Sequence, residues 1–336
     1  LEDVLTEVME VFPSHYIHIG GDEAEKTSWK TCVDCQYRMR HNKLKNVEEL
    51  QSYLVCRIEK FLNENGRSMI GWDEILEGGL SPNATVMSWR GESGGIKAAQ
   101  MGHDVVMTPG EFCYFDGYQD APHTQPLAMG GFLTLGKVYS YDPVPQNLTV
   151  AEAKHILGVQ ANLWTENIST PEHTEYMIYP RLCALSEVAW TEPQNKDAAF
   201  FREKALGEVE WLKAHGYHPF ELKNEIGDRP ESREMLHHLA KAKKVTYNNE
   251  WSKQYAAGGE TALTDGICGG WTYGDGKWQG FIGKDFDVTI DMGEPVEISS
   301  VGLTFMQFSK SWVYMPLSVK VSVSEDGASY AELSDV

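Results

Sequence analysis

Short apolar runs alternate with helical segments from residue 1 to about 216. A helix is predicted over 1–12 and an amphipathic helix over 47–62, and longer helical segments cover 172–190 and 197–215. The apolar runs between them are nearly unbroken, as in strands that are buried on both faces of a sheet. These predicted strands are HYIHI (15–19), SMIGW (68–72), ATVMSW (84–89), DVVMTP (104–109) and LGVQANLW (157–164).

The alternation of strands and helices predicts a parallel sheet with helices outside it. Conspicuous polar and aromatic residues follow the predicted strands, where a barrel of eight strand–helix units places its active site. They are Asp22, Glu23, Trp72, Trp89, Tyr114, Trp164 and Glu166. We therefore predict an α/β fold of the (β/α)8 TIM-barrel type over 1–216, with five of the eight strands present.

The pattern changes near residue 240, where apolar residues begin to alternate with polar ones. This alternation covers 286–292 and 317–323, and the turn signals DGKW, GEP and EDGAS interrupt the region. We predict an all-β antiparallel sandwich over 245–336, truncated at its C-terminal end, and a helical linker over 217–244.

The composition excludes several classes of partner. The formal net charge of −20 argues against nucleic acid, which requires clustered Lys and Arg. No run approaches the roughly 20 apolar residues that a membrane helix needs, so no membrane insertion is expected. Cys32 and Cys35 have C-x-x-C spacing, which we interpret as incidental thiols, with half a zinc site, a redox pair or a local disulfide as alternatives. No cofactor or metal ion is predicted, because no phosphate-cradling loop or second ligand pair is present.

Two adjacent carboxylates, Asp22 and Glu23, end the first predicted strand. Adjacent strand residues point to opposite faces, so both can reach one pocket only where the backbone turns, which Gly20 and Gly21 permit. One interpretation is that Asp22 caps a helix beginning EAEKTSWK. The other is chemical, since one carboxylic acid can protonate a leaving oxygen while its neighbour holds a substrate group that attacks in place of a protein nucleophile.

The stretch HIGGDE resembles the H-x-G-G-D-E signature of glycoside hydrolase family 20, the β-N-acetylhexosaminidases. Four more blocks follow in the order of the family, namely GWDE, SWRG, YFDG and NLWTE. The resemblance covers residues 1–216 and implies that the five predicted strands are the last five of the barrel.

The resemblance implies a catalytic role for three residues. Glu23 is expected to be the general acid and later the base for water, with a raised pKa. Asp22 is expected to hydrogen-bond the N–H of the 2-acetamido group and to stabilise the oxazolinium-like intermediate. Tyr114 is expected to donate its hydroxyl to the acetamido oxygen.

The resemblance implies a binding role for five more residues. Three tryptophans are expected to wall the pocket, and two carboxylates to bind ring hydroxyls. The tryptophans are Trp72, Trp89 and Trp164, and the carboxylates are Asp116 and Glu166. Other polar residues nearby are interpreted as structural: Asp73 and Glu74 as the start of a helix, His18 as a hydrogen-bonding residue and Arg181 as part of an ion pair.

The chain departs from the family in its coverage. Three initial strands, a sugar-binding arginine on the first of them and an acidic residue before HIGGDE have no counterpart in this sequence. We therefore expect further chain upstream, carrying any signal segment, and no activity from this polypeptide alone.

Residues 245–336 resemble a coagulation factor 5/8 type C, or discoidin-like, domain. The blocks that carry the resemblance are ALTDGICGGW, WQGF, VTIDMGEPVEISSVGL and PLSVKVSVSEDGASY. It implies an accessory module that binds sugars or surfaces through loops. We interpret Trp271, Trp278 and Trp312 as packing residues, with a binding face as the alternative.

The leading hypothesis is an exo-acting, retaining hydrolase that removes terminal β-linked N-acetylglucosamine or N-acetylgalactosamine from glycans outside the cytoplasm. The alternative is a non-catalytic glycan-binding protein with a decayed barrel. A metal hydrolase using His18, Asp22 and Glu23 has no supporting ligand spacing. The sugar preference and the oligomeric state stay open.

Overall fold

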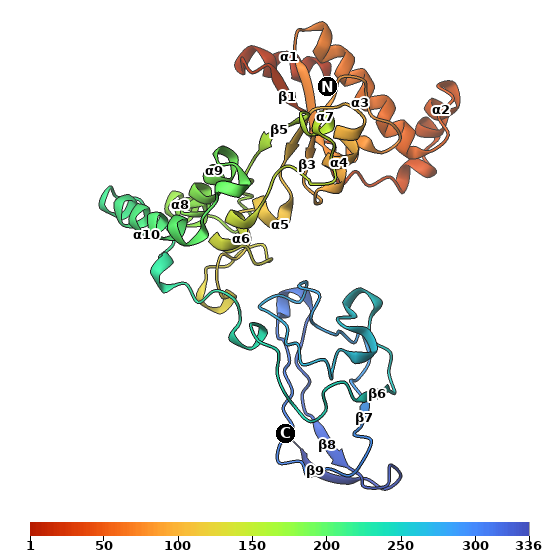
Figure 1. Cartoon of the computed structure of the whole chain (residues 1–336). Coiled ribbons are helices and arrows are strands. Elements are labelled where there is room, and N and C mark those ends of the chain that lie inside the picture. The colour runs from red at the N-terminus through yellow and green to blue at the C-terminus, as the bar shows by residue number, and fades with distance from the viewer. Residues whose placement is uncertain (336) are drawn as a thin grey trace. The chain divides into compact units, whose positions relative to one another are not determined.

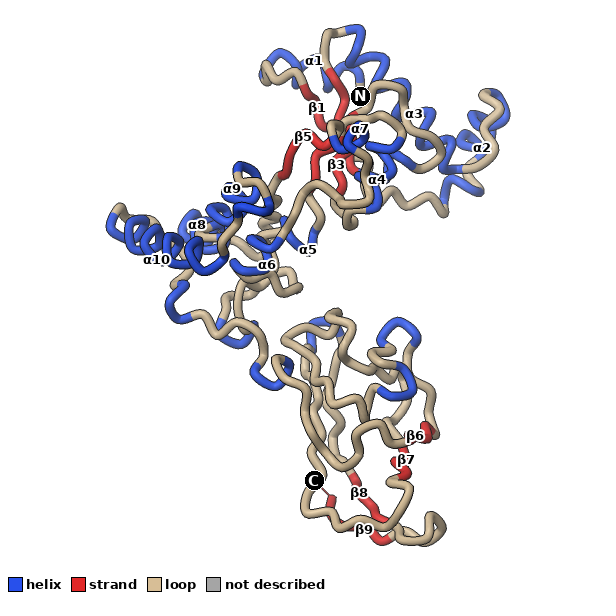
Figure 2. The backbone as a smooth tube through the Cα atoms, viewed as in Figure 1, coloured by secondary structure: helices blue, strands red, loops and turns tan. Residues whose placement is uncertain are grey.

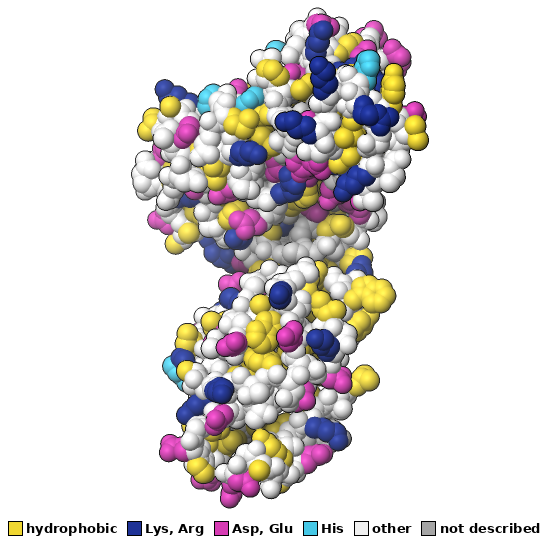
Figure 3. Space-filling view, turned by 90° about the vertical axis from the view of Figure 1, so that its right-hand side faces the viewer, with side chains coloured by type: hydrophobic (Ala, Val, Ile, Leu, Met, Phe, Trp, Pro, Cys, Tyr) yellow, Lys and Arg dark blue, Asp and Glu magenta, His cyan; other side chains and the backbone are white. Residues whose placement is uncertain are grey.

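The computed structural model describes residues 1–335 as two compact units (Figure 1). The first unit is Leu1–Glu225, and the second begins at Ile226. On the face shown in Figure 3, Lys and Arg side chains are interspersed with Asp and Glu. This face therefore carries no continuous basic surface of the kind that binds nucleic acid.

A five-stranded parallel sheet forms the centre of the first unit, in the order β1-β2-β3-β4-β5. The strands are β1 (Tyr16–His18), β2 (Ser68–Trp72), β3 (Thr85–Ser88), β4 (Val105–Met107) and β5 (Ile156–Val159). Each strand pairs with the next one along the chain, as in a barrel wall and unlike a doubly wound sheet. The predicted partial α/β barrel is thereby confirmed.

The α-helices of the first unit precede, connect and follow these strands along the chain (Figure 1). They are α1 (Glu2–Val11), α2 (Val33–His41), α3 (Val47–Glu64), α4 (Ser93–Gln100), α5 (Gly110–Cys113), α6 (Leu135–Ser140), α7 (Val150–Ala153), α8 (Pro171–Ile178), α9 (Arg181–Trp190) and α10 (Ala198–Ala214). The single helix expected over 172–190 is two helices, because Pro180 interrupts the backbone hydrogen bonding between α8 and α9.

The strands bury side chains on both faces of the sheet. Met69, Val86 and Val105 are fully buried in the main core of the unit, which includes residues of α3 and α4. Ile70 and Met87, which alternate with them, pack with Trp72 on the opposite face. This two-sided burial explains why the strands read as nearly continuous apolar runs.

The second unit contains little regular structure among its described residues (Figure 2). Strands β6 (Lys244–Tyr247) and β7 (Val288–Asp291) form one antiparallel pair, and β8 (Lys320–Val323) and β9 (Ala331–Asp335) form another. These pairs include the alternating segments that we expected to be strands. The complete discoidin-like sandwich stays a prediction.

The segment 217–244, expected to be a helical linker, contains no α-helix. It holds the short 3-10 helices Leu222–Asn224 and Pro230–Ser232 and the first residue of β6, and the boundary between the units falls inside it, after Glu225. Gly227 has a positive φ of 72°, and Pro230 lacks an N–H, so neither residue supports a continuous helix here.

The end of β1 is a tight glycine turn. Gly20 and Gly21 have φ angles of +75° and +98°, and a Cβ on Gly21 would lie 2.8 Å from Ile75. The Gly20 N–H donates to Nδ1 of His18 at 3.0 Å, and the Gly20 carbonyl accepts from the Trp72 N–H at 3.0 Å. His18 thus has the structural role that the sequence indicated, as the acceptor that fixes the turn before the carboxylate pair.

A fully buried arginine holds the loop after α5. Arg181 is 0% exposed, and its guanidinium donates to four backbone carbonyls from three separate segments. The carbonyls belong to Phe115, Gly117, Leu133 and Met177. The side chain that we expected to form a structural ion pair therefore mainly cross-links backbone, and it lies close enough to Asp116 to interact with its charge.

Replacing Arg181 with Met should lower the free energy of unfolding of the first unit by about 3 kcal/mol or more, because buried carbonyls lose their donors. Urea titration followed by tryptophan fluorescence in the full-length protein measures this loss. Arg57→Met is the matched control, since Arg57 is exposed and its contact with Glu2 at 3.4 Å should contribute about 1 kcal/mol at most. Equal losses in the two variants would contradict the role of Arg181.

Protonation of His18 should destabilise the first unit. Burial lowers the pKa of His18 below its usual value of 6.5, and Asp22 only partly opposes this. The unfolded chain therefore binds the proton more tightly, so the contribution of neutral His18 is fully present above pH 6.5 and is lost as the pH falls through the folded-state pKa.

Urea titrations between about pH 8 and pH 5 measure this dependence. His18→Gln, which keeps an acceptor without the titration, should flatten the profile, whereas His41→Gln on α2 should leave it as in the wild type. An unchanged slope in His18→Gln would show that another group causes the acid destabilisation.

Candidate active site

Four aromatic rings meet at the C-terminal ends of the strands. Trp72 lies 6.5 Å from Trp89 and 6.2 Å from Trp164, measured between ring centroids. Tyr114 stacks on Trp89 at 6.1 Å, with 22° between the ring planes, and lies 6.5 Å from Trp164. We call Trp72, Trp89, Tyr114 and Trp164 the aromatic cluster. All four were predicted site residues, and the structure brings them together.

The register of the sheet explains why these rings converge. Trp72, at the end of β2, is opposite Met87 of β3, and Trp89 follows β3 directly. A parallel bridge joins Tyr114 to Asn162, which continues the pairing of β4 and β5 beyond their ends. The rings therefore lie at the same edge of the sheet, although the segments that carry them are far apart in sequence.

A cavity of about 610 Å³ lies against the cluster on the inner face of the sheet. Trp72 and Trp164 line one part of it, and Gln160 and Asn162 contribute amide groups. The other lining residues are Tyr16, His18, Ile70, Met87, Val106, Ala161 and Leu163.

Asp22 lies on the exposed turn after β1, within range of the cluster. Its charge acts on the pKa values of both His18 and Tyr114, so the carboxylate lies within electrostatic range of both. Glu23 is exposed and has a left-handed backbone with φ of +47°. Such a conformation is uncommon for glutamate and is typical of functional turns.

The structure contradicts the helix-cap interpretation of Asp22. Residues 23–27 are irregular, and the next helical elements are the 3-10 helix Ser28–Lys30 and α2. The positive φ angles of Gly20, Gly21 and Glu23 prevent a helix from starting here. The carboxylate pair therefore lies on a turn, free of a capping role.

Tyr114 remains a hydrogen-bond donor at any ordinary pH. Burial raises the pKa of its hydroxyl to about 12, with Asp116 and Asp22 adding to the effect. The hydroxyl is thus protonated and available to a ligand oxygen.

Two further carboxylates lie close enough to interact with each other. Asp116 is 7% exposed, and burial raises its pKa, with Glu166 adding to the shift and Arg181 opposing it. Among the described residues, Oδ1 of Asp116 has no hydrogen-bond partner, although it is buried. Glu166 is exposed. An unpaired buried acceptor beside an exposed carboxylate can accept hydrogen bonds from ligand hydroxyl groups.

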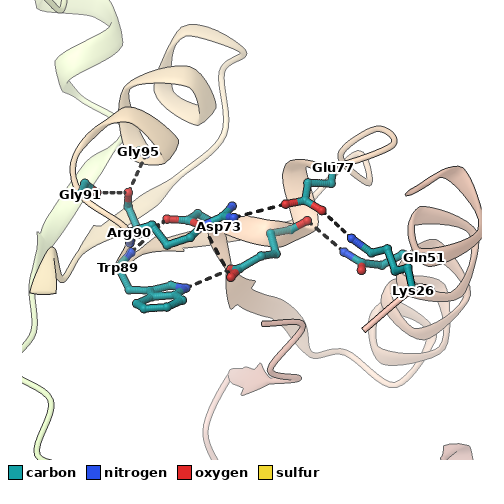
Figure 4. A network of polar contacts seen from close by, with 10 residues as sticks. Lys26, Gln51, Asp73, Glu77, Trp89, Arg90, Gly91 and Gly95 are labelled. Atoms are coloured by element: carbon teal, nitrogen blue, oxygen red, sulfur yellow. Dashed lines mark hydrogen bonds and ion pairs between the residues drawn. The ribbon is translucent and has the colours of Figure 1, made fainter. Parts of the chain in front are cut away.

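A network of charged side chains contacts Trp89 of the aromatic cluster (Figure 4). Asp73 and Glu74 begin the 3-10 helix Asp73–Leu76, as the sequence predicted for a helix start, but both also contact the segment after β3. Oε2 of Glu74 accepts from the Trp89 indole N–H at 3.0 Å, and Oδ1 of Asp73 accepts from Nε of Arg90 at 2.5 Å.

The supporting role of this network was missed by the sequence analysis. The sequence did contain a sign of it. Two tryptophans of the aromatic cluster are directly followed by residues of opposite charge, acidic in GWDE and basic in SWRG.

The described residues contain no group of three or more His, Cys, Asp or Glu side chains placed to hold a metal ion. All six cysteines are free thiols, including the Cys32 and Cys35 pair at the start of α2. In the part of the chain that the structure describes, no helix is both long enough and apolar enough to span a bilayer.

Comparison with known proteins identifies the first unit. Residues 1–193 match the model of glycosyl hydrolase family 20, catalytic domain. A β-hexosaminidase of Porphyromonas gingivalis is 51% identical over 221 residues, which are 65% of this chain and 28% of that protein. A β-hexosaminidase of Vibrio furnissii is 38% identical over 191 residues, which are 55% of this chain and 31% of that protein.

A solved structure agrees with these matches. The family 20 exo-β-N-acetylglucosaminidase of Vibrio harveyi, in complex with N-acetylglucosamine, superposes with a TM-score of 0.60 at 32% identity. The match covers 66% of this chain and 35% of that one, so the chain spans about a third of the length of these relatives. The family match over residues 1–193, together with the fold, means that this chain belongs to glycosyl hydrolase family 20.

Proposed function

We propose that the protein is an exo-acting, retaining β-N-acetylhexosaminidase that removes terminal β-linked N-acetylglucosamine or N-acetylgalactosamine from glycans. The observation that carries the proposal is the aromatic cluster itself, with the Asp22 carboxylate within electrostatic range of the Tyr114 hydroxyl. An anion and a protonated donor at one apolar wall suit the N–H and C=O of an acetamido group. The names of the relatives, and the sugar bound to the Vibrio harveyi enzyme, support the same chemistry.

The proposed first step uses the acetamido group as the nucleophile. Its carbonyl oxygen attacks the anomeric carbon, while Glu23 gives a proton to the departing glycosidic oxygen. The Asp22 carboxylate accepts a hydrogen bond from the acetamido N–H, and its negative charge balances the positive charge of the cyclic oxazolinium ion. Tyr114 donates to the carbonyl oxygen and orients it for attack.

The second step returns the enzyme to its starting state. Glu23, now ionised, takes a proton from water, and the oxygen of that water attacks the anomeric carbon. The bond to the acetamido oxygen breaks, the acetamido group is restored, and the product keeps the β configuration. Two inversions at one carbon account for the retained stereochemistry.

Binding of the sugar is assigned to the remaining predicted residues. Trp72, Trp89 and Trp164 enclose the apolar faces of the ring and the acetamido methyl group. Asp116 and Glu166 accept hydrogen bonds from ring hydroxyl groups, and the unpaired Oδ1 of Asp116 supports this role. Carboxylates at these positions favour a terminal sugar, whose hydroxyl groups are free.

The assays below use the full-length protein. The described sheet is open, with β1 and β5 at its two edges. Closing a barrel of eight strands requires further units between those edges. A chromogenic β-N-acetylglucosaminide tests the proposal directly, and binding without turnover would favour the alternative of a decayed, glycan-binding barrel.

We infer that the second unit is a discoidin-like accessory module and that the enzyme acts outside the cytoplasm. The antiparallel pairs β6-β7 and β8-β9 support the first inference, and the glycan substrate supports the second. A structure of the isolated unit and fractionation of the producing cells would test them separately.

Glu23→Gln should lower kcat by about 10²–10⁴-fold for substrates with a poor leaving group, because no proton reaches the departing oxygen. The loss should be much smaller with a dinitrophenyl leaving group, which departs without protonation. Glu25→Gln is the matched control, since Glu25 lies on the same exposed loop and accepts a local N–H from Thr27 at 2.6 Å. Full activity of Glu23→Gln on a poor leaving group would refute the acid role.

Asp22→Asn should lower kcat by about 10²–10³-fold for 2-acetamido substrates, because the neutral amide cannot balance the charge of the cyclised intermediate. The measurement compares the same variant on 2-acetamido and 2-hydroxy glycosides, the latter serving as the control. It also compares the affinity for a thiazoline that mimics the intermediate. Equal losses on both substrates would contradict the orienting role.

A further inference from the structure

Hydrogen bonds hold both the backbone and the side chain of Glu74 next to the aromatic cluster. It directly follows Trp72 and Asp73 at the end of β2, and it is 6% exposed. Its backbone carbonyl accepts from Nε2 of Gln51 on α3 at 3.0 Å. The carboxylate thus projects from a backbone that is fixed to the outer layer of the barrel.

The Glu74 carboxylate binds the edge of the Trp89 ring in the aromatic cluster. Its Oε2 accepts from Nε1 of Trp89 at 3.0 Å. The indole N–H can only donate, so this bond fixes both the rotamer of the ring and the side of the ring that faces Glu74. Nε of Arg90, at 3.5 Å from Oε1, provides a positive charge beside the same carboxylate (Figure 4).

The neighbouring carboxylate fixes the backbone at Trp89. Oδ2 of Asp73 accepts from the N–H groups of Trp89 and Arg90 at 3.1 and 3.2 Å. With its backbone held by Asp73 and its ring by Glu74, Trp89 has little freedom to move. Its ring stacks on Tyr114 at 6.1 Å, so the position of the indole also sets that of the phenol.

The same network reaches the loop of the carboxylate pair. Arg90 contacts Glu77 at 3.3 Å, and Glu77 pairs with Lys26 at 2.5 Å (Figure 4). Lys26 lies three residues after Glu23. Ion pairs through Glu77 therefore connect the segment that carries Trp89 to the loop that follows Asp22 and Glu23.

We propose that Glu74 is a positioning residue that fixes the Trp89 indole and thereby sets the size of the N-acyl group that the site accepts. The inference rests on the proposed function, in which Trp89 encloses the acetamido group. A fixed indole closes the pocket against a longer acyl chain. A released indole can turn aside and admit it.

Four variants of the full-length protein test the proposal. Glu74→Leu removes the acceptor and keeps an apolar group of similar size, and Glu74→Gln keeps an acceptor for Nε1. Glu59→Leu is the matched control, because Glu59 is 4% exposed and accepts one N–H, from Asn83 at 2.6 Å. Trp89→Phe identifies the signal of Trp89 in protein labelled with 5-fluorotryptophan.

Two measurements are made on the wild type and on the three glutamate variants. The first is the ¹⁹F resonance of Trp89 without substrate, which should shift or broaden in Glu74→Leu only. The second is the ratio of kcat/KM for N-acetyl over N-propanoyl glycosides. Pockets discriminate about 10–200-fold for one methylene group. The ratio should fall about tenfold in Glu74→Leu, return towards the wild-type value in Glu74→Gln and stay unchanged in Glu59→Leu.

A wild-type resonance and a wild-type ratio in Glu74→Leu would overturn the proposal. A change of the same size in Glu59→Leu would also overturn it, because the effect would then come from losing any buried glutamate and not from the contact of Glu74 with Trp89. If the wild type hydrolyses neither substrate, the proposed function fails, while the ¹⁹F resonance still decides whether Glu74 fixes the indole.

A second substitution covers the case in which Glu74→Leu does not fold. Replacing the Trp89 indole with benzothiophene exchanges the N–H for sulfur and breaks the same bond from the donor side. The acyl ratio should again fall about tenfold. An unchanged ratio there would overturn the proposal.

Discussion

The packing of four rings at one edge of a parallel sheet is the constraint on which the site depends. Trp72, Trp89, Tyr114 and Trp164 come from segments up to 92 residues apart, yet their centroids lie 6.1–6.5 Å from their neighbours. The regular register of β2 to β5 brings them together, since each parallel strand ends at the same edge. Any change in that register would separate the four rings from one another.

Buried charge maintains this arrangement. Arg181 ties the backbone around Phe115 and Gly117 to α9, and this loop carries Tyr114 and Asp116. Asp73 and Glu74 do the same for the segment of Trp89. Buried ionic groups cost desolvation energy, which excellent hydrogen-bonding geometry offsets. Their value here is position, because oriented groups stabilise a transition state only if they are already in place.

Much of the barrel could be predicted from the sequence. The strands were found because burial on both faces makes them apolar throughout, as in Met69 and Ile70. The four rings of the aromatic cluster were found because their motifs follow the strands in the order of the family. The turn at Gly20 and Gly21 was visible in the sequence. The helix cap at Asp22 was wrong, because the positive φ of Glu23, which a glutamate does not signal, continues that turn. The contact of Glu74 with Trp89 joins two strands, and sequence spacing does not report it.

The central claim is that the substrate supplies its own nucleophile. Aryl glycosides bearing N-acetyl, N-fluoroacetyl, N-difluoroacetyl and N-trifluoroacetyl groups test it most directly, because fluorine withdraws electrons from the carbonyl oxygen and changes the size of the group little. The account predicts that kcat/KM of the full-length enzyme falls steeply with each added fluorine. A rate that is independent of fluorination would contradict it.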